Sequence, residues 1–298
     1  MIIHFTNEEF ILLGLQLAGF SVTRIGSTGA ATNNERFKSF FGISATTCSI
    51  LFEDFQTTDV DDAKIKNPVP KKLLTALIYL KEYRTKYSLA AFADVTEKVA
   101  LQWAHEYVGK IQALKDTKIK WLFDNPAQYP ELFIISVDGV HCRIGEPRTQ
   151  PSAGWFSKKY NKAGLAYELG IAIFHNQLCW INGPFPAGHN DMKMFKNDNG
   201  LMEKIPAGRK AIGDEGYVGV PNHVATRNPF DSDAVKRFKK RVKARHETFN
   251  GRLKDFGILE QRFRGQGASR VEKHKAVFEA CCVLVQYQMD NGHPLFDV

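Results

Sequence analysis

The chain has 298 residues with a net charge of +8, and 44% of its residues are hydrophobic. That length is enough for a sizeable core and for two domains, and the charge indicates a polyanionic partner without choosing between nucleic acid and a membrane surface. No apolar run approaches the ~20 residues of a membrane span, which excludes a transmembrane protein. The five cysteines are odd in number and lack zinc-ligand spacing, which predicts reduced, buried thiols in a soluble intracellular protein.

The N-terminal residues predict one helix followed by a linker. Thr6-Asn-Glu-Glu9 has the pattern of a capping box before an apolar stretch, so a helix is expected to begin there. Residues 26–34 are rich in Gly, Ser, Thr and Asn, the composition of a flexible linker. We therefore assign residues 1–34 to an N-terminal helix and a linker.

A helical domain is predicted over residues 35–125. Pro70 suits a helix start, and apolar residues recur on one face of residues 71–83. A short helix over residues 88–93 and a longer one over residues 96–115 follow after short turns.

These three helices are compatible with a helix-turn-helix DNA-binding unit. In that interpretation Lys98, Gln102 and His105 face the DNA groove, because they lie off the apolar stripe of their helix. The alternative is a plain helical bundle, which periodicity alone favours.

The pattern changes after residues 124–130, which read as a domain boundary. Strands are then predicted at residues 132–137, 166–174, 177–183 and 210–213, and helices at residues 190–195, 236–253 and 269–289. This order, βββαβ followed by helices, is that of the ribonuclease H-like fold, in which the first and fourth strands lie side by side. Residues 131–298 are therefore predicted to form an α/β domain with a mixed sheet, preceded by the all-α domain.

Four acidic residues stand at informative places in this second domain. Asp138 and Asp214 each end an apolar strand, where side chains project into the crevice beyond a sheet. Glu247 lies on the helix after the fourth strand, and Asp191 lies where a loop enters a helix. Carboxylates converging from distant elements can hold Mg²⁺ or Mn²⁺, and a pair of such ions supports phosphodiester cleavage.

Each of these acids also has a purely structural interpretation. Asp191 would serve equally well as a first-turn acid favoured by the helix dipole, and Asp214 as the acid of an Asx turn before Gly216. Glu247 is the single acid among nine Lys and Arg between residues 236 and 254, where it could form ordinary i,i+4 pairs. The coincidence of all four in one predicted domain favours the metal site.

The basic residues of the same domain suit phosphate contacts. The candidates for holding the DNA backbone are Lys158, Lys159, Lys240, Lys243, Arg245 and Lys254. Trp155 is a candidate for stacking on DNA, with a core position as the alternative.

Four motifs occur in a fixed order along the chain: Ser136-Val-Asp-Gly-Val-His141, Gly188-His-Asn-Asp191, Gly213-Asp-Glu-Gly-Tyr217 and His246-Glu-Thr-Phe-Asn-Gly-Arg-Leu-Lys254. With them the chain resembles the PIF/Harbinger-type DDE transposases and the nucleases derived from these, from about residue 35 to its end. Lys254 matches a lysine of related bacterial transposases, whereas Lys240 and Lys243 stand where those enzymes carry Tyr and Arg.

The resemblance implies that Asp138, Asp214 and Glu247 are catalytic and that Asp191 joins them in binding two divalent metal ions. It further implies cleavage and strand transfer at the ends of transposons in double-stranded DNA, a nuclear location in a eukaryotic host, and a separate Myb-like DNA-binding partner. Whether the protein forms a homo-oligomer is left open by the resemblance. The main alternative is a domesticated transposase that binds DNA or recruits partners with little nuclease activity. A metal-dependent phosphohydrolase or RNA nuclease with the same acids is a second alternative.

Overall fold

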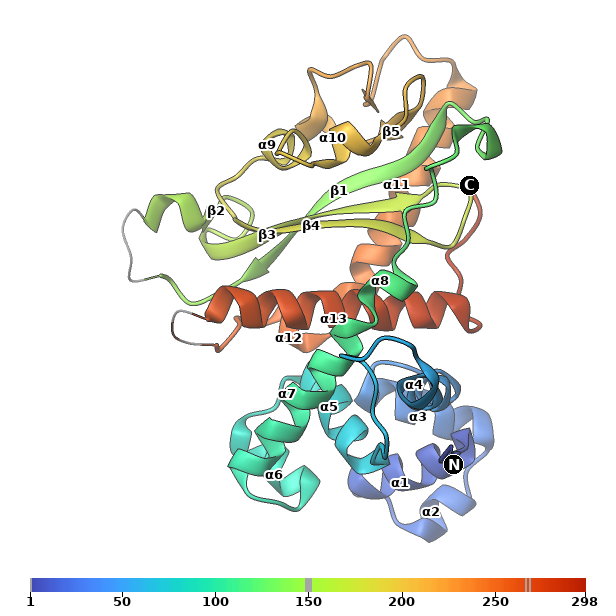
Figure 1. The fold of residues 1–298 in the computed structure, drawn as a ribbon, viewed down its shortest axis with the longest axis vertical. Coiled ribbons are helices and arrows are strands. Elements are labelled where there is room, and N and C mark those ends of the chain that lie inside the picture. The colour runs from blue at the N-terminus through green and yellow to red at the C-terminus, as the bar shows by residue number, and fades with distance from the viewer. Residues whose placement is uncertain (1, 148–151, 266, 268) are drawn as a thin grey trace. The chain divides into compact units, whose positions relative to one another are not determined.

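A computed structural model describes residues 2–147, 152–265, 267 and 269–298 of the chain. These residues form two compact units (Figure 1). The helical unit comprises Met1–Lys118, Leu253–Gln261 and Ala276–His293, and the sheet unit comprises Ile119–Arg252, Arg262–Lys275 and Pro294–Val298. The division thus falls after residue 118 rather than at the predicted boundary of 124–130, and the helical unit also takes in two segments from the predicted second domain.

The helical unit is built from short helices packed through aromatic side chains. Its helices are α1 Asn7–Leu17, α2 Val22–Gly26, α3 Ala30–Phe41, α4 Ala45–Thr57, α5 Pro70–Glu82, α6 Lys86–Ala93, α7 Glu97–Ala113, α8 Lys115–Lys118, α12 Gly257–Glu260 and the greater part of α13 Arg270–Asp290. The predicted capping box is present, since Thr6 accepts from the Glu9 N–H at 3.2 Å and the Glu9 carboxylate accepts from the Thr6 N–H at 2.7 Å.

The prediction of a flexible linker at residues 26–34 is wrong. Helix α3 begins at Ala30, directly after Gly29. The buried Asn33 donates from one side-chain nitrogen to the Ile25 carbonyl at 2.9 Å and to the Thr28 carbonyl at 3.2 Å. Polar residues that suggested a linker therefore fasten α2 to α3, and the rings of Phe37 and Phe41 are fully buried.

The sheet unit holds a mixed sheet. Its strands are β1 Phe133–Arg143, β2 Phe156–Ser157, β3 Lys162–Ala172, β4 Leu178–Pro186, β5 Lys210–Ile212 and β6 Val224–Ala225. The sheet runs in the order β2-β3-β1-β5-β6, and β4 also pairs with β3. Strand β3 is antiparallel to β1 and to β4, whereas β5 is parallel to β1 and to β6. The predicted first and fourth strands, β1 and β5, are thus neighbours.

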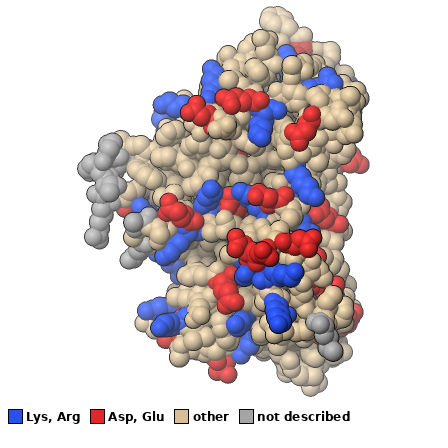
Figure 2. Space-filling model, viewed as in Figure 1, with Lys and Arg blue, Asp and Glu red and all other residues tan. Residues whose placement is uncertain are grey.

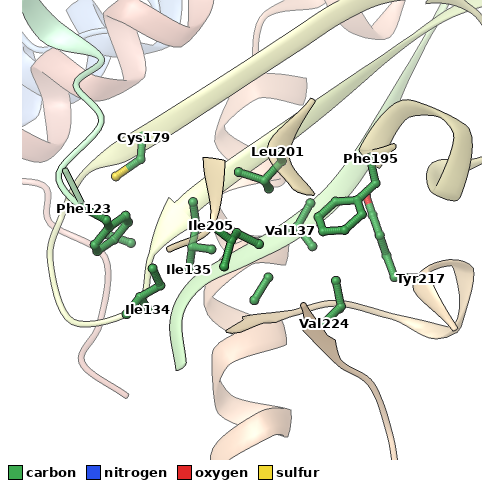
Figure 3. Packing of buried hydrophobic residues seen from close by; sticks show 12 residues of the cluster. Phe123, Ile134, Ile135, Val137, Cys179, Phe195, Leu201, Ile205, Tyr217 and Val224 are labelled. Carbon is green, nitrogen blue, oxygen red and sulfur yellow. The ribbon is translucent and has the colours of Figure 1, made fainter. Parts of the chain in front are cut away.

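Helical segments cover both faces of the sheet. The short segments η1 Pro126–Gln128, η2 Ser152–Trp155, α9 Asp191–Phe195, α10 Leu201–Lys204 and η3 Glu215–Tyr217 precede the long helix α11 Asp233–Lys254. On one face Ile135 and Val137 pack with Phe195 and Tyr217 (Figure 3), and on the other Val242 of α11 packs with Ile212 and Ile173. Burial on both faces explains why residues 133–137 form an apolar run without alternation.

Three arginines of α11 bind the last part of the chain through its backbone. Arg241 donates to the carbonyl of Asp297 at 2.6 Å, and Arg245 to the carbonyl of Phe296 at 3.0 Å. Arg252 donates to the carbonyl of Pro294 at 2.9 Å. Residues 294–297 are therefore held against this helix by main-chain acceptors.

Replacing the buried Phe195 by alanine should destabilise the protein by about 3–5 kcal/mol, because the side chain is fully buried in the sheet unit's core. The matched variant Phe230→Ala removes a ring that is 93% exposed and should change stability by no more than about 0.5 kcal/mol. Urea denaturation followed by circular dichroism measures both. Equal effects of the two substitutions would contradict this assignment of the core.

Candidate active site

Three of the four predicted acids come from three different elements. Asp138 lies in the middle of β1 and not at its end, because the strand continues to Arg143 with Val140 and Cys142 buried. Asp191 is the first residue of α9, which Asn190 caps by accepting from the Lys193 N–H at 2.9 Å.

Asp214 precedes η3, and its Oδ1 accepts from the Gly216 N–H at 2.8 Å. The structural interpretations of Asp191 and Asp214, as a first-turn acid and an Asx-turn acid, are therefore both present. These local roles are compatible with a role in the site, since the local structure at Asp191 and at Asp214 helps to set the direction of each carboxylate.

Two glycines leave room for the Asp191 carboxylate. A Cβ at position 139 would lie 2.5 Å from Asp191 Oδ1, and a Cβ at position 216 would clash with Asp191 Oδ2. The Cβ at 216 would also lie 3.0 Å from Asp214 Oδ1. Gly139 and Gly216 thus form a cradle that brings the carboxylates of Asp191 and Asp214 close to β1.

The core behind this cradle sets its shape. Phe195 ends α9 and Tyr217 ends η3, and their rings meet edge to face with centroids 5.6 Å apart (Figure 3). Such an arrangement is the preferred geometry of an aromatic pair. The two short segments that begin at Asp191 and near Asp214 are consequently fixed to each other by their last residues.

The three carboxylates repel one another. Burial raises the pKa of Asp138 to about 6, the hydrogen bond from the Gly139 N–H lowers it in part, and Asp214 and Asp191 raise it further. Burial and then Asp214 raise the pKa of Asp191. Lys159 opposes both shifts, so this exposed lysine lies within electrostatic range of the acids. The arrangement favours a cation at this place.

Two residues that the sequence analysis did not select complete the acidic site. Glu168 of β3 pairs with Gly139 across the sheet and is fully buried. Burial and then Asp191 raise the pKa of Glu168 to about 8, although Trp180 Nε1 donates to its Oε1 at 3.1 Å. The Tyr217 hydroxyl is also buried, and burial followed by Glu168 and Asp191 raises its pKa.

Helix α11 meets Asp138 through an amide rather than through the predicted glutamate. Asn250 Nδ2 donates to Asp138 Oδ2 at 2.8 Å, and one turn earlier Ser136 Oγ and His246 Nδ1 share a hydrogen bond of 2.8 Å. Glu247 lies three residues before Asn250, on the same side of the helix and ~4.5 Å along its axis. Its exposed side chain lines a neighbouring pocket and is not among the charges that shift the pKa of Asp138.

The donor set fits a hard cation. Oxygen ligands are those that Mg²⁺ and Mn²⁺ prefer. Glu168 Oε2 and Asn250 Oδ1 are buried oxygen atoms that lack a hydrogen-bond partner among the described residues. Within that same part of the chain, no three His, Cys, Asp or Glu side chains are placed to hold one ion as they stand.

The predicted phosphate contacts divide into exposed and buried residues. Lys158, Lys159 and Lys240 are exposed and Lys243 is half-buried. Lys240 and Lys243 line a pocket of about 600 Å³ together with Glu247. On the face drawn in Figure 2, basic and acidic side chains alternate, and neither sign covers a continuous field.

Arg245 is buried, whereas the predicted contact with the DNA backbone requires an exposed guanidinium. It is only 4% exposed, and its guanidinium donates to the carbonyls of Ala172, His175 and Phe296 at 2.7, 2.8 and 3.0 Å. The prediction that Arg245 contacts DNA phosphate is therefore corrected to a structural role. Lys254 belongs to the helical unit, where its Nζ lies 3.4 Å from the Leu259 carbonyl and 4.0 Å from Glu260.

The predicted groove-facing residues lie on α7. Lys98, Gln102 and His105 are all exposed, and the His105 ring contacts Tyr79 edge to face at 5.7 Å. The helices α5, α6 and α7 follow the predicted ranges closely.

The mixed sheet and its acidic cradle define an α/β protein with several carboxylates around one strand. Residues 137–286 match the family model of the DDE superfamily endonucleases, and the chain belongs to that family. The match contains Asp138, Asp191, Asp214 and Glu247. Neither a curated protein nor a solved structure matches the chain. No helix in the described part of the chain is long and apolar enough to cross a membrane.

Replacing Glu168 by glutamine should remove a pH dependence of stability. The folded pKa of about 8 lies above the ordinary value of 4.5, so the folded protein keeps a proton that the unfolded chain loses between these values. Stability of the parent should therefore fall as the pH rises from 4.5 to 8. Glu168→Gln should match the parent near pH 5 and exceed it above pH 8 by roughly 2–4 kcal/mol, since one pKa unit is ~1.4 kcal/mol.

Urea denaturation at both pH values measures this difference, with Glu203→Gln as the exposed control. A gap between parent and Glu168→Gln that is the same at pH 5 and at pH 8.5 would contradict the raised pKa.

Replacing Arg245 by methionine should destabilise the protein by about 2–4 kcal/mol, because buried carbonyls lose a charged donor. The matched change Lys240→Met on the exposed side of α11 should leave stability within about 0.5 kcal/mol. Thermal and urea denaturation measure both variants. A stable Arg245→Met protein with weakened DNA binding would restore the original prediction.

Proposed function

We propose that the protein is a divalent-metal-dependent DNA endonuclease that cleaves and transfers strands at the ends of a mobile element. The observation that carries this proposal is the placement of Asp138, Asp191 and Asp214, from three separate elements, within electrostatic range of one another. Membership of the DDE superfamily endonucleases supports it, because these nucleases generally use divalent metals.

The finer assignments also belong to this proposal. The strand arrangement β4-β3-β1-β5-β6, with β5 and β6 parallel to β1, supports a ribonuclease H-like catalytic unit. We assign the chain to the PIF/Harbinger type on its four motifs, with double-stranded transposon ends as substrate, a nuclear location and a Myb-like protein as partner. Exposed Lys98, Gln102 and His105 support α5–α7 as a helix-turn-helix-like DNA contact.

The residues of the site would act as follows. Asp138, Asp191, Asp214 and Glu247 would hold the ions, with Glu168 behind Asp191. The ions would activate the attacking hydroxyl or water and stabilise the leaving oxygen. Asn250 orients Asp138 by its hydrogen bond, and the Gly216 N–H orients Asp214. Lys159, Lys240 and Lys243 would attract phosphates that the acids alone would repel.

One observation favours the alternative of a domesticated DNA-binding protein with little cleavage. Within the described residues no three ligands are placed for one ion, and Asn250 rather than Glu247 contacts Asp138. In that case the acids bind metal weakly or singly, and the basic surface retains DNA. The experiment below separates the two functions.

Asp138→Asn should reduce nicking of supercoiled plasmid in Mn²⁺ by at least about 10²-fold, because metal ions contribute several kcal/mol to stabilising charge in the transition state. Mn²⁺ binding by calorimetry should weaken in parallel, while duplex affinity in Ca²⁺ stays close to that of the parent.

Asp198→Asn is the control, since this acid is exposed and lies outside the cradle. A parent protein that binds duplex DNA and Mn²⁺ but nicks nothing would support the domesticated function. Equal nicking by the parent and Asp138→Asn would remove Asp138 from catalysis.

A further inference from the structure

A rigid turn precedes α11 and displays one aromatic ring. The Asp231 N–H donates to the Asn228 carbonyl at 3.2 Å, and the Phe230 N–H donates to Asn228 Oδ1 at 3.0 Å. Pro229 occupies the second position of this four-residue turn, where proline's fixed φ is favourable. The sequence Asn-Pro-Phe-Asp therefore specifies the turn locally.

A buried ion pair fastens the turn to the helix. Lys239 Nζ contacts Asp231 Oδ2 at 2.7 Å and donates to the Thr226 carbonyl at 2.9 Å. The two side chains are only 10% and 17% exposed. One lysine of α11 thus holds the last residue of the turn and the chain two residues before its start.

The ring at the tip of this turn has no structural use in the described chain. Phe230 is 93% exposed, the highest value among the large hydrophobic side chains described as exposed. Phe230 is thus an exposed apolar ring on a turn whose backbone is held by hydrogen bonds, and it is accessible for a contact with another molecule.

The turn and α11 together enclose the pocket of about 600 Å³. Asn228 and Asp231 line it, and Phe230 lies between these two residues in the chain without lining the pocket itself. Five cations and two carboxylates line the same pocket; the cations are Arg227, Lys236, Lys239, Lys240 and Lys243.

Three of these cations are available for a ligand. Lys239 is paired with Asp231, and Lys236 lies 3.9 Å from Asp233. Among the described residues, no ion pair includes Arg227, Lys240 or Lys243. Glu247, a proposed metal ligand, lies in the wall of the same pocket.

We propose that this pocket binds one nucleotide of a DNA strand that has left the base stack. Phe230 stacks on the base, and Arg227, Lys240 and Lys243 hold the phosphates on either side of it. The volume lies within the roughly 300–1,000 Å³ of ligand pockets, and an aromatic ring beside cations is the usual platform for single-stranded nucleic acid. That the pocket lies beside the scissile phosphate rests on the proposed function. That the pocket binds an unpaired nucleotide does not.

The test measures binding of the full chain, in Ca²⁺, to a fluorescent single-stranded oligonucleotide and to a duplex carrying one unpaired 2-aminopurine. Phe230→Ala should weaken both affinities by about tenfold, because stacking of one base contributes ~1–3 kcal/mol. The slope of log affinity against log salt should stay unchanged in this variant, since no charge is removed.

Phe230→Trp should restore binding, and Phe174→Ala, which removes another exposed phenylalanine, should leave it unchanged. The double variant Lys240→Gln, Lys243→Gln should instead flatten the salt slope on the single strand by about 1.4, at ~0.7 per phosphate contact. Binding of the parent protein should raise 2-aminopurine fluorescence, because the base leaves its stacked neighbours and is held against the Phe230 ring. Binding of the Phe230→Ala variant should not raise this fluorescence.

Equal oligonucleotide affinity and equal fluorescence for parent and Phe230→Ala would overturn the proposal and leave the ring as a contact for a protein. None of these readouts needs cleavage. A parent that fails to nick plasmid but loses oligonucleotide affinity on Phe230→Ala would contradict the proposed nuclease alone.

Discussion

The absence of side chains at positions 139 and 216 is the constraint on which the acidic site depends. The Asp191 carboxylate fills space that a Cβ at either position would occupy. A side chain at either position would force the Asp191 carboxylate to turn away from its place. The packing of Phe195 against Tyr217 supplies the opposing force, because burial of these rings offsets the cost of burying Asp138 and Asp191 and of their mutual repulsion, which together raise the pKa values of both carboxyls. A carboxylate cluster of this kind is assembled by the core behind it and not by attraction among its members.

Helix α11 has two faces with separate tasks. Val242, Arg245, His246 and Phe249 are buried and follow the i, i+3, i+4, i+7 spacing of an inward face. Burial lowers the pKa of His246 to about 3, so the imidazole that meets Ser136 is neutral. Lys240, Lys243 and Glu247 are not among these inward positions and line the pocket. One helix can therefore hold the sheet and present charge to a ligand without either task limiting the other.

Local signals in the sequence were sufficient for most elements, and nonlocal contacts account for the misses. The capping box at Thr6 and the pairing of β1 with β5 follow from spacing and strand order, whereas β1 continues to Arg143, beyond its expected end at residue 137. The order of chain segments cannot reveal that residues 253–261 and 276–293 join the helical unit. Glu168 was missed because a single acid inside an apolar strand carries no signal until Gly139 is known to face it.

The error at Arg245 was avoidable, since its spacing from Val242 and Phe249 places it on the inward face of α11. The contact of Asn250 with Asp138 was not predicted, because only acidic side chains were considered as members of the site. Phe230 was overlooked because its exposure depends on the turn that Lys239 fastens. The sequence analysis considered Trp155 instead, a residue that is half-buried in the structure.

The hydrogen bonds that Arg241, Arg245 and Arg252 donate to residues 294–297 do not depend on the side chains of those residues. Every acceptor is a main-chain carbonyl, which all amino acids present alike. The segment is nevertheless only partly free to change in composition, because the Phe296 ring lies 5.1 Å from the Arg241 guanidinium and Leu295 is buried. Among relatives we would therefore expect Arg252 to be kept while position 294 varies, because only the main-chain carbonyl of Pro294 takes part in that contact.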